Sequence, residues 1–400
     1  MLADPSDDRH ADVVGALARM VELGASDLCL KVGNRPLVRI DGELRCLDGD
    51  AHELAPDDTL QMLHEVLPDA RLKEFEQEHE VDFAYSVPRL ARFRVNAYLQ
   101  RGSVSMVFRV VPHAIRSLAD LGLPDVIRQL AEEQRGLILV NGTTGSGKST
   151  TLAAIVEHIN EIAHKHIVTI EDPIEYLHRD RRSAIDQREV GSDTASFATA
   201  LRRVLRQDPD VILIGEMRDE TTVRTALTAA ETGHLVLSTV HALDAAETVN
   251  RILDFFPPAQ HQQVRAMLAG TLKGIISQRL VPRADGSGRI AIAEILTSTG
   301  RVHDLILDRE RTGELAEVIE EGGYYGMQTF DQALYGAVQA GTVAVEDAMR
   351  YATRPHDLRL LLDTQGHLHT TMADVISQDE RAPSESGPAA PPARGAEVLL

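Results

Sequence analysis

One stretch decides the fold of this 400-residue chain: Gly142-Thr143-Thr144-Gly145-Ser146-Gly147-Lys148-Ser149, followed by Thr150. It fits the pattern G-x-x-x-x-G-K-[ST], which is typical of a phosphate-binding P-loop. Glycines allow successive backbone N–H groups to curl around a phosphate. We expect the Lys148 ammonium on the β- and γ-phosphates of a nucleotide and the Ser149 hydroxyl on Mg²⁺.

The flanks of this stretch have the structure that the motif needs. Residues 137–140 form an apolar run that predicts a buried strand, and residues 150–161 carry apolar side chains at helical spacing. The N-terminus of that helix adds a positive dipole to the phosphate site. A chance Gly/Ser-rich turn would lack both flanks, so the sequence predicts a nucleotide-binding α/β domain.

Polar residues also follow three further predicted strands, at the point where each strand ends. Glu171 and Asp172 follow strand 166–170, Glu216 follows strand 211–214, and His241 lies just past strand 234–239. Ligands of parallel sheets bind at the carboxyl ends of the strands. We therefore expect these side chains to converge on the P-loop.

Each of these residues has an expected role. Glu216 is the expected general base, since a carboxylate there orients or deprotonates the attacking water in hydrolysing P-loop enzymes; a turn-capping surface acid is the alternative. Glu171 and Asp172 are expected to shape the water and Mg²⁺ positions, with solvated acids as the alternative. His241 is the candidate γ-phosphate contact. His234 lies roughly 23 Å away along an extended strand and is expected to be structural or to lie at a subunit edge.

Two groups of arginines are candidates for contacts between subunits. Arg92, Arg94 and Arg109 lie on predicted strands of the first domain and could face the phosphates of a neighbouring subunit. The segment 202–206 carries three arginines on one helix face, which is either a solvated, salt-bridged surface or a subunit contact.

Composition excludes several classes of protein. With 41 basic and 61 acidic residues the net charge is −20, which argues against a general nucleic-acid surface. The only cysteines, Cys29 and Cys46, form neither a disulfide framework nor a Cys-rich zinc site. The acidic N-terminus does not read as a signal peptide, and no apolar run approaches the roughly 20 residues of a spanning helix. We expect a cytoplasmic chain with any membrane link through partners.

Patterning divides the chain into four parts: an α+β domain at 1–112, a connector at 113–135, an α/β domain with a helical C-terminal subdomain at 136–376, and a disordered tail at 377–400. In the first domain we expect helices at 13–23 and 57–75, a hairpin turning at Asp41-Gly42, and strands at 82–87, 91–99 and 104–111. In the second we expect helices at 196–206 and 221–232 and, beyond residue 245, mainly helix with one hairpin at 285–288.

Together these motifs resemble those of one protein family. Residues 142–149, 169–176, 215–219 and 232–241 are similar to the Walker A, Asp box, Walker B and His box of secretion-superfamily ATPases. More narrowly, the chain resembles the type IV pilus retraction ATPases of the PilT family, with supporting stretches at 25–28, 91–96, 277–280 and 325–331. The resemblance runs from about residue 25 to 362 with no large insertion.

The resemblance implies a RecA-like core, a smaller PAS-like N-terminal domain and a homohexameric ring. It implies that ATP and Mg²⁺ bind between the domains, with Ser149 and Asp172 on the metal side, and that Arg94 and Arg109 approach the phosphates. The implied function is pilus disassembly for twitching motility. The ring would act at the inner face of the cytoplasmic membrane, through a polytopic platform protein and with a paralogous pilus ATPase as a further partner.

Several alternatives remain open at this stage. Pilus assembly and type II secretion ATPases usually carry a longer N-terminal region and a four-cysteine site that this chain lacks. The retraction subfamily's Ala-Ile-Arg-Asn-Leu segment is replaced by Arg301-Val302-His303-Asp304-Leu305. In the family that segment is tied to retraction rather than to ATP turnover, so a PilU-type accessory ATPase stays open. A RecA-like nucleic-acid motor and a non-hydrolysing nucleotide-gated scaffold are the alternatives from other classes.

Overall fold

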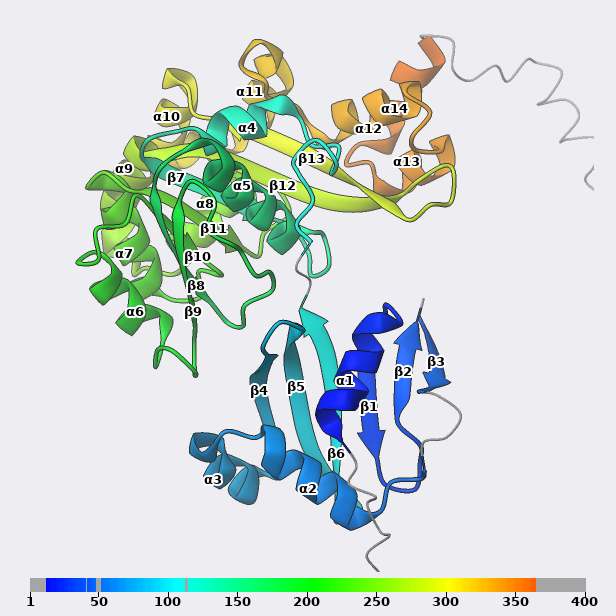
Figure 1. Cartoon of the computed structure of the whole chain (residues 1–400). Coiled ribbons are helices and arrows are strands. Elements are labelled where there is room, and N and C mark those ends of the chain that lie inside the picture. The colour runs from blue at the N-terminus through cyan, green and yellow to red at the C-terminus, as the bar shows by residue number, and fades with distance from the viewer. Residues whose placement is uncertain (1–11, 41, 48–51, 112–113, 365–400) are drawn as a thin grey trace, which may run out of the picture.

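Two β-sheets organise the molecule, shown in Figure 1 as a lower and an upper body of a computed structural model. Residues 12–40, 42–47, 52–111 and 114–364 are described. The lower sheet is antiparallel, with strand order β3-β2-β1-β6-β5-β4. Its elements are α1 Val13–Glu22, β1 Asp27–Lys31, β2 Leu37–Ile40, β3 Glu43–Cys46, α2 Pro56–Val66, α3 Asp69–Glu78, β4 Glu80–Val87, β5 Ala91–Gln100 and β6 Ser103–Val111.

The upper sheet has seven strands in the order β13-β12-β7-β11-β10-β8-β9, and all but the edge strand β13 run parallel. Its elements up to the last strand are α4 Asp125–Ala131, β7 Gly136–Asn141, α5 Lys148–Ile162, β8 His166–Glu171, β9 Ala184–Glu189, α6 Phe197–Val204, β10 Val211–Ile214, α7 Glu220–Glu231, β11 Leu235–Val240, α8 Ala245–Asp254, α9 His261–Thr271, β12 Leu272–Pro282 and β13 Arg289–Thr297.

Helices complete the C-terminal part of the described chain. They are α10 Gly300–Leu307, α11 Leu315–Glu321, α12 Phe330–Gln339, α13 Val345–Tyr351 and α14 Pro355–Thr364, with short 3₁₀ turns at Pro258–Gln260, Arg309–Glu314 and Gly322–Tyr325. Helices α12–α14 pack on the β12–β13 hairpin around their own apolar cluster. In that cluster Phe330 is fully buried, and the Arg279 guanidinium lies 3.8 Å from the centre of its ring.

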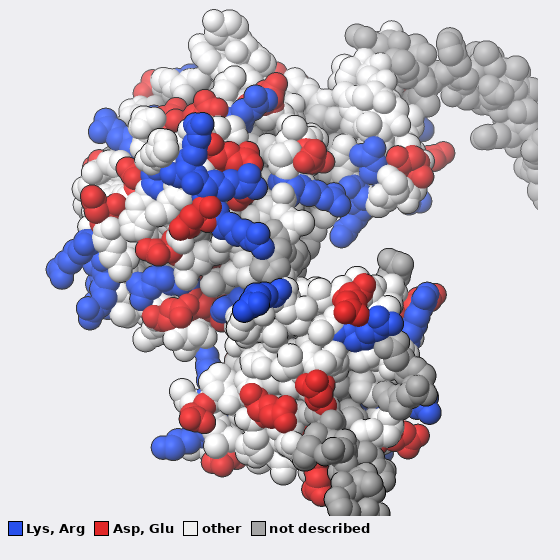
Figure 2. Space-filling view, viewed as in Figure 1, with Lys and Arg blue, Asp and Glu red and all other residues white. Residues whose placement is uncertain are grey.

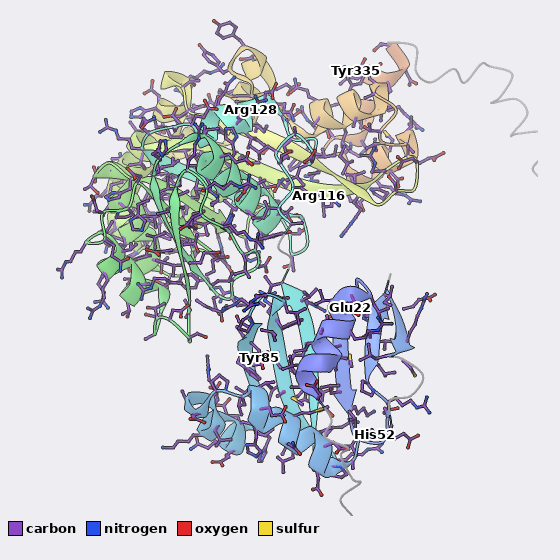
Figure 3. All side chains as sticks on the ribbon, in the orientation of Figure 1. Glu22, His52, Tyr85, Arg116, Arg128 and Tyr335 are labelled. Atoms are coloured by element: carbon purple, nitrogen blue, oxygen red, sulfur yellow. The ribbon has the colours of Figure 1, made fainter. Side chains whose placement is uncertain are left out.

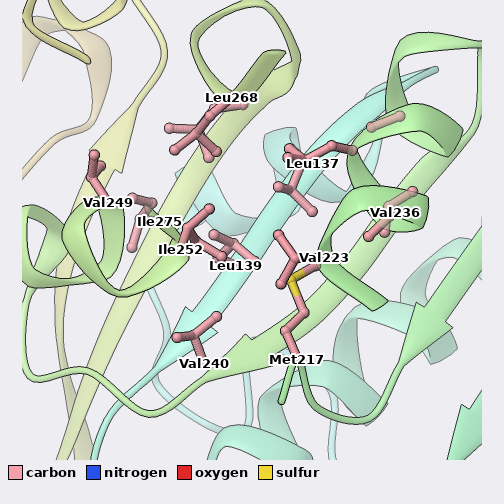
Figure 4. Packing of buried hydrophobic residues seen from close by; sticks show 14 of the residues in the cluster. Leu137, Leu139, Met217, Val223, Val236, Val240, Val249, Ile252, Leu268 and Ile275 are labelled. Carbon is pink, nitrogen blue, oxygen red and sulfur yellow. The ribbon is translucent and has the colours of Figure 1, made fainter. Parts of the chain in front are cut away.

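The central strand β7 separates two apolar cores because its side chains alternate between the faces of the sheet. Leu137 and Leu139 belong to the cluster formed with α6–α11, part of which appears in Figure 4. Ile138 and Val140 belong to the cluster formed with α4 and α5 on the opposite face. All six residues of β7 are buried, as expected for the inner strand of a sheet that helices cover on both sides.

The lower sheet has an apolar core of its own, built from α1–α3 and one face of the strands. The segment that leads from this sheet to the parallel sheet carries Arg116, labelled in Figure 3 at the upper body. Among the described residues, two ion pairs join the bodies directly. Arg92 contacts Glu189 at 3.1 Å, and Arg94 contacts Glu175 at 3.2 Å.

Most predicted elements are confirmed, including the hairpins at residues 37–46 and 272–297 and the strands that lead into the site. The single helix expected at 57–75 is wrong. The chain forms α2 and α3 instead, because Pro68 forces Leu67 into an extended conformation. Strand β9 was not predicted. The expected tail at 377–400 and the boundary expected at 112–113 lie outside the described residues.

Candidate active site

A cavity of about 550 Å³ opens at the carboxyl ends of the parallel strands. The predicted convergence is confirmed, because residues that follow β7, β8, β10 and β11 all line it. The predicted site residues that line this cavity are Thr144, Gly145, Gly147, Lys148, Ser149, Thr150, Glu171, Asp172, Glu216 and His241. Gly142, Thr143 and Ser146 belong to the same loop but do not line the cavity; Gly142 and Ser146 are buried and Thr143 is exposed.

The P-loop is shaped by its glycines. Gly147 has φ +94°, a left-handed conformation that suits glycine, and it directly precedes α5. A Cβ on Gly142 would come within 2.5 Å of the Gln278 carbonyl oxygen and 2.6 Å of the Ser146 hydroxyl. No side chain caps the N-terminus of α5, so its first N–H groups face the cavity as an anion site.

The side chains of the loop fit a phosphate. Lys148 Nζ donates hydrogen bonds to the carbonyl oxygens of Gly142 and Thr143, at 2.9 and 3.0 Å. Burial lowers the pKa of Lys148, while the carboxylates of Glu216 and Glu175 oppose this shift. Ser146 Oγ is buried and has no hydrogen-bond partner among the described residues, as expected of a donor placed for a ligand. The loop therefore offers a phosphate the Lys148 ammonium group and the Ser146 hydroxyl as a further hydrogen-bond donor.

Glu216 is the centre of a charged cluster on the opposite side of the cavity. His241 Nε2 lies 3.1 Å from Glu216 Oε1, and Arg218 Nε donates to Glu216 Oε2 at 2.9 Å. Arg218 also approaches Asp172, at 3.7 Å. The Glu216 side chain is only 20% exposed, so its carboxylate is held in one orientation between two cationic or polar partners.

Glu171 occupies a more enclosed position than its neighbour Asp172. It accepts hydrogen bonds from the Thr169 hydroxyl at 2.7 Å and from the Gln187 amide at 3.3 Å. Burial raises the pKa of Glu171, the hydrogen bonds oppose the rise, and the nearby Glu175 carboxylate adds to it. A carboxyl with a raised pKa beside a phosphate site is suited to exchanging a proton.

The two predicted arginines lie in different places. Arg94 Nη2 donates to Glu175, which lines the cavity, so Arg94 stands one residue away from it. Arg109 Nε instead donates to Asp27 at 2.7 Å, within the lower sheet. The structure brings Arg94 to the edge of the site within one chain and leaves Arg109 outside it. His234, expected to be structural, has its Nδ1 3.0 Å from the carbonyl oxygen of Ala229.

Sequence reasoning gave no role to several residues that line the cavity. The Tyr176 hydroxyl lies 2.8 Å from Thr150 Oγ1, and Arg218 bonds Glu216 as described. Both belong to stretches already singled out, so their closeness to Glu171 and Glu216 was the available signal. Leu280 and Arg289 come from the β12–β13 hairpin, more than a hundred residues after the P-loop. Leu280 ends the stretch 277–280 quoted for the resemblance, whereas no local pattern marks Arg289.

Comparison with known proteins agrees with this geometry. The family model described as "Type II/IV secretion system protein" matches residues 77–350. The chain is 42% identical over 349 residues to the type IV pilus retraction ATPase PilT of Pseudomonas aeruginosa, which covers 86% of this chain and 99% of the relative. It is 43% identical over 346 residues to the type IV pilus ATPase PilU of the same species, covering 86% and 90%.

A solved structure shares the whole architecture. The crystal structure of the pilus retraction motor PilT with bound ADP superposes with a TM-score of 0.80 at 44% sequence identity. The match covers 87% of this chain and 99% of that chain. At this identity the similarity extends beyond the fold to the sequence itself.

Proposed function

We propose that this chain hydrolyses ATP to drive pilus retraction for twitching motility. The reason is that it belongs to the type II/IV secretion system protein family and, within that family, to the type IV pilus retraction ATPases. The observation that carries the proposal is that the P-loop, Glu216 and His241 line one and the same cavity. A nucleotide held by the loop would place its terminal phosphate toward the Glu216 carboxylate.

In the proposed reaction Glu216 accepts a proton from a water molecule, and the oxygen of that water attacks the γ-phosphorus. The bond from the γ-phosphorus to the β,γ-bridging oxygen breaks, and ADP and phosphate leave. Lys148 balances the charge on the phosphate oxygens. His241, 3.1 Å from Glu216, orients the carboxylate and contacts the γ-phosphate. Glu171, with its raised pKa, is the second proton-exchanging group.

Mg²⁺ is the expected metal partner of the nucleotide. The Ser149 hydroxyl and, through water, the Asp172 carboxylate are the oxygen ligands that would hold it, and both line the cavity. Such an ion supplies charge neutralisation for the phosphates. Asp172 is already close to Arg218, so its carboxylate is shared between a cation of the chain and the ion site.

The same family membership supports a proposal about the assembly. We propose a homohexamer acting at the inner face of the cytoplasmic membrane through an inner-membrane platform protein, with a paralogous pilus ATPase as a further partner. Within the residues that the structure describes, every helix falls short of the length and apolarity that crossing a membrane requires. In the ring, Arg94 and Arg109 are proposed to reach the phosphates, Arg94 by leaving Glu175.

Two other functions are weighed by specific observations. The 43% identity to a PilU supports an accessory role almost as well as the match to PilT supports the principal one. A nucleic-acid motor is disfavoured, because the net charge is −20 and Figure 2 shows acidic and basic side chains intermingled over the viewed face.

The experiment that tests the proposal is the variant Glu216→Gln. It keeps the size and shape of the side chain but removes the base, and its amide accepts hydrogen bonds through one oxygen where the carboxylate has two. We expect kcat for phosphate release to fall by about 100-fold or more, with the Kd for ATP changed less than about threefold. Glu220→Gln, which removes a half-exposed acid that pairs with Arg224 four residues along the chain, is the matched control and should retain activity.

An experiment in cells tests the biological role. In the source bacterium, Glu216→Gln in place of the wild-type residue should leave pili on the surface that no longer retract. Normal turnover by the purified variant would show that Glu216 is not the base. Abolished turnover with normal retraction in cells would assign retraction to a paralogue and leave this chain the accessory role.

A further inference from the structure

A row of paired residues crosses the parallel sheet directly beside the candidate active site. Val240 on β11 pairs with Asn141 on β7, Asn141 pairs with Ser277 on β12, and Ser277 pairs with Glu294 on β13. His241 follows Val240 in the chain, and Gly142 follows Asn141. The row therefore lies one residue from both the candidate γ-phosphate contact and the first glycine of the P-loop.

The polar members of this row bind the N-terminus of α8. Asn141 Nδ2 donates to the carbonyl oxygen of Asp244 at 3.1 Å and also to the hydroxyl of Thr248. The backbone N–H of Ala245 donates to Glu294 Oε1 at 3.0 Å, and the Ser277 hydroxyl donates to the same oxygen at 3.3 Å. Two strands of the sheet thus hold the first turn of one helix.

These contacts are buried, which makes them informative. Asn141, Thr248 and Ser277 have no exposed surface, and Glu294 is largely enclosed. Burial raises the pKa of Glu294 to about 7, with the Asp244 carboxylate adding to the rise; the hydrogen bonds from Ala245 and Ser277 and the charge of Arg279 oppose it. Packing alone would be served by an apolar side chain, so a carboxyl here needs a reason beyond filling space.

The loop between β11 and α8 has few other anchors. Its residues are His241, Ala242, Leu243 and Asp244. The Ala242 N–H bonds the carbonyl oxygen of Val240 next to it, and the Leu243 N–H bonds Glu247 in α8 itself. Among the described residues, the hydrogen bonds that join this end of α8 to the sheet are those of Asn141 and Glu294.

We propose that Glu294, together with Asn141, is a positioning residue for ATP hydrolysis that fixes the His241–Asp244 loop relative to the P-loop. This inference rests on the proposed function of the cavity. Neither side chain lines the cavity, so neither contacts the nucleotide. Both act on His241, which must reach Glu216 across 3.1 Å while the P-loop holds the phosphates on the other side. A displacement of about 1 Å at a reacting centre can lower a rate by up to about 100-fold.

The first test reads the loop directly and needs no turnover. In Glu294→Ala, hydrogen exchange of the peptide covering residues 240–249 should become about tenfold faster than in the wild-type protein, because the Ala245 N–H loses its acceptor. Asp331→Ala is the matched control. Asp331 is also a buried carboxylate that accepts two backbone N–H groups, those of Thr353 and Arg354, but it lies among α12–α14. It should leave exchange at 240–249 unchanged.

The second test separates positioning from stability. We expect Glu294→Ala to lower kcat about tenfold with the Kd for ATP within about twofold of wild type, and Glu294→Gln to restore most of the rate because its amide oxygen still accepts both hydrogen bonds. Asn141→Ala should act like Glu294→Ala. The double variant should lose less than the product of the two effects, since both residues hold one helix end.

Three results would overturn the inference: unchanged exchange at 240–249 in Glu294→Ala, an undiminished kcat in that variant, or losses that multiply in the double variant. A failure of the proposed function looks different. It would appear as a wild-type protein without phosphate release, or as normal turnover in Glu216→Gln, whereas the exchange measurement reports on Glu294 in either case.

Discussion

At the scale of single residues, the candidate site is organised around charges that are partnered within the chain. Lys148 is held by two carbonyl oxygens of its own loop, and Glu216 is held by His241 and Arg218. The two contacts of Glu216 fix the orientation of its carboxylate, and a carboxylate that is already oriented needs less reorganisation during reaction.

Glu294 provides a residue-scale prediction about pH. Its pKa in the folded protein is about 7, compared with 4.5 as the ordinary value in the unfolded chain. The folded state binds the proton more tightly, so this contribution to stability is fully present below about pH 4.5 and is lost as the pH rises through about 7. Glu294→Gln has no such dependence. Relative to the variant, the wild-type protein should lose about 1 kcal/mol of stability between about pH 6 and pH 8.

Thermal unfolding of both proteins at the two pH values measures this difference, as a relative shift in Tm of roughly 2–4 °C. Glu317→Gln, at an exposed acid on α11, is the control and should follow the wild type at both pH values. Parallel pH dependences for wild type and Glu294→Gln would mean that the Glu294 carboxyl is not protonated in the folded protein near neutral pH.

At the scale of secondary-structure elements, the sequence predicted the features that neighbouring residues determine. The glycines of the P-loop and the apolar runs before Glu171 and Glu216 mark a strand end directly, and the structure confirms these positions. Strand β9 escaped prediction because its sequence, Ala-Ile-Asp-Gln-Arg-Glu, suits an edge strand with one side in water and offers no apolar run. The prediction of one helix at 57–75 was wrong because it followed the helical periodicity and ignored the break that Pro68 makes between α2 and α3.

Other parts of the site could not be predicted because they depend on pairing between distant strands. Asn141 and Glu294 are ordinary polar residues in the sequence, and only the register β7–β12–β13 places them in one row. The same holds for Arg289, which reaches the cavity from the end of a hairpin. Arg109 shows the converse, since its strand position was predicted but its partner Asp27 was not.

Helix α7, which follows the Glu216 strand, gives an element-scale prediction. Asp219 belongs to the stretch 215–219, but its carboxylate accepts the N–H of Thr222 at 2.8 Å and so caps this helix. Asp219→Ala should destabilise the protein by about 1 kcal/mol, whereas Asp219→Ser, another good capping residue, should cost far less. Chemical unfolding measures both. Equal losses in the two variants would show that the carboxylate does more than cap α7.

At the scale of the whole molecule, the ion pair of Arg92 and Glu189 joins the lower sheet to the parallel sheet beside the candidate site. Glu189 is 5% exposed; it accepts the Ile174 N–H at 3.0 Å as well as the Arg92 guanidinium. Ile174 lies just after Asp172, so the contact reaches the segment that borders the cavity. A rotation of the lower sheet that broke this pair would leave Glu189 enclosed without its cation, which disfavours the motion.

A double-mutant cycle measures the strength of this ion pair. We expect Arg92→Ala and Glu189→Gln to show a coupling energy of about 1–3 kcal/mol in chemical unfolding, because the pair is largely shielded from water. The exposed pair of Arg45 and Glu43, with 58% and 73% of the side chains in solvent, is the matched control and should couple by less than about 1 kcal/mol. A coupling of the same small size at both pairs would mean that the two bodies are not held together by Arg92.

The apolar interior is divided, with one cluster inside the lower sheet, two on the faces of the parallel sheet and one under α12–α14. Because the lower-sheet cluster is built from α1–α3 and one face of its own sheet, we expect heat to melt it in a transition distinct from that of the nucleotide-binding body. Two transitions in thermal unfolding are the expected outcome. A midpoint temperature belongs to one melting unit, and substitutions at Asp219 or Glu294 change the midpoint of the parallel-sheet unit while the other transition stays in place.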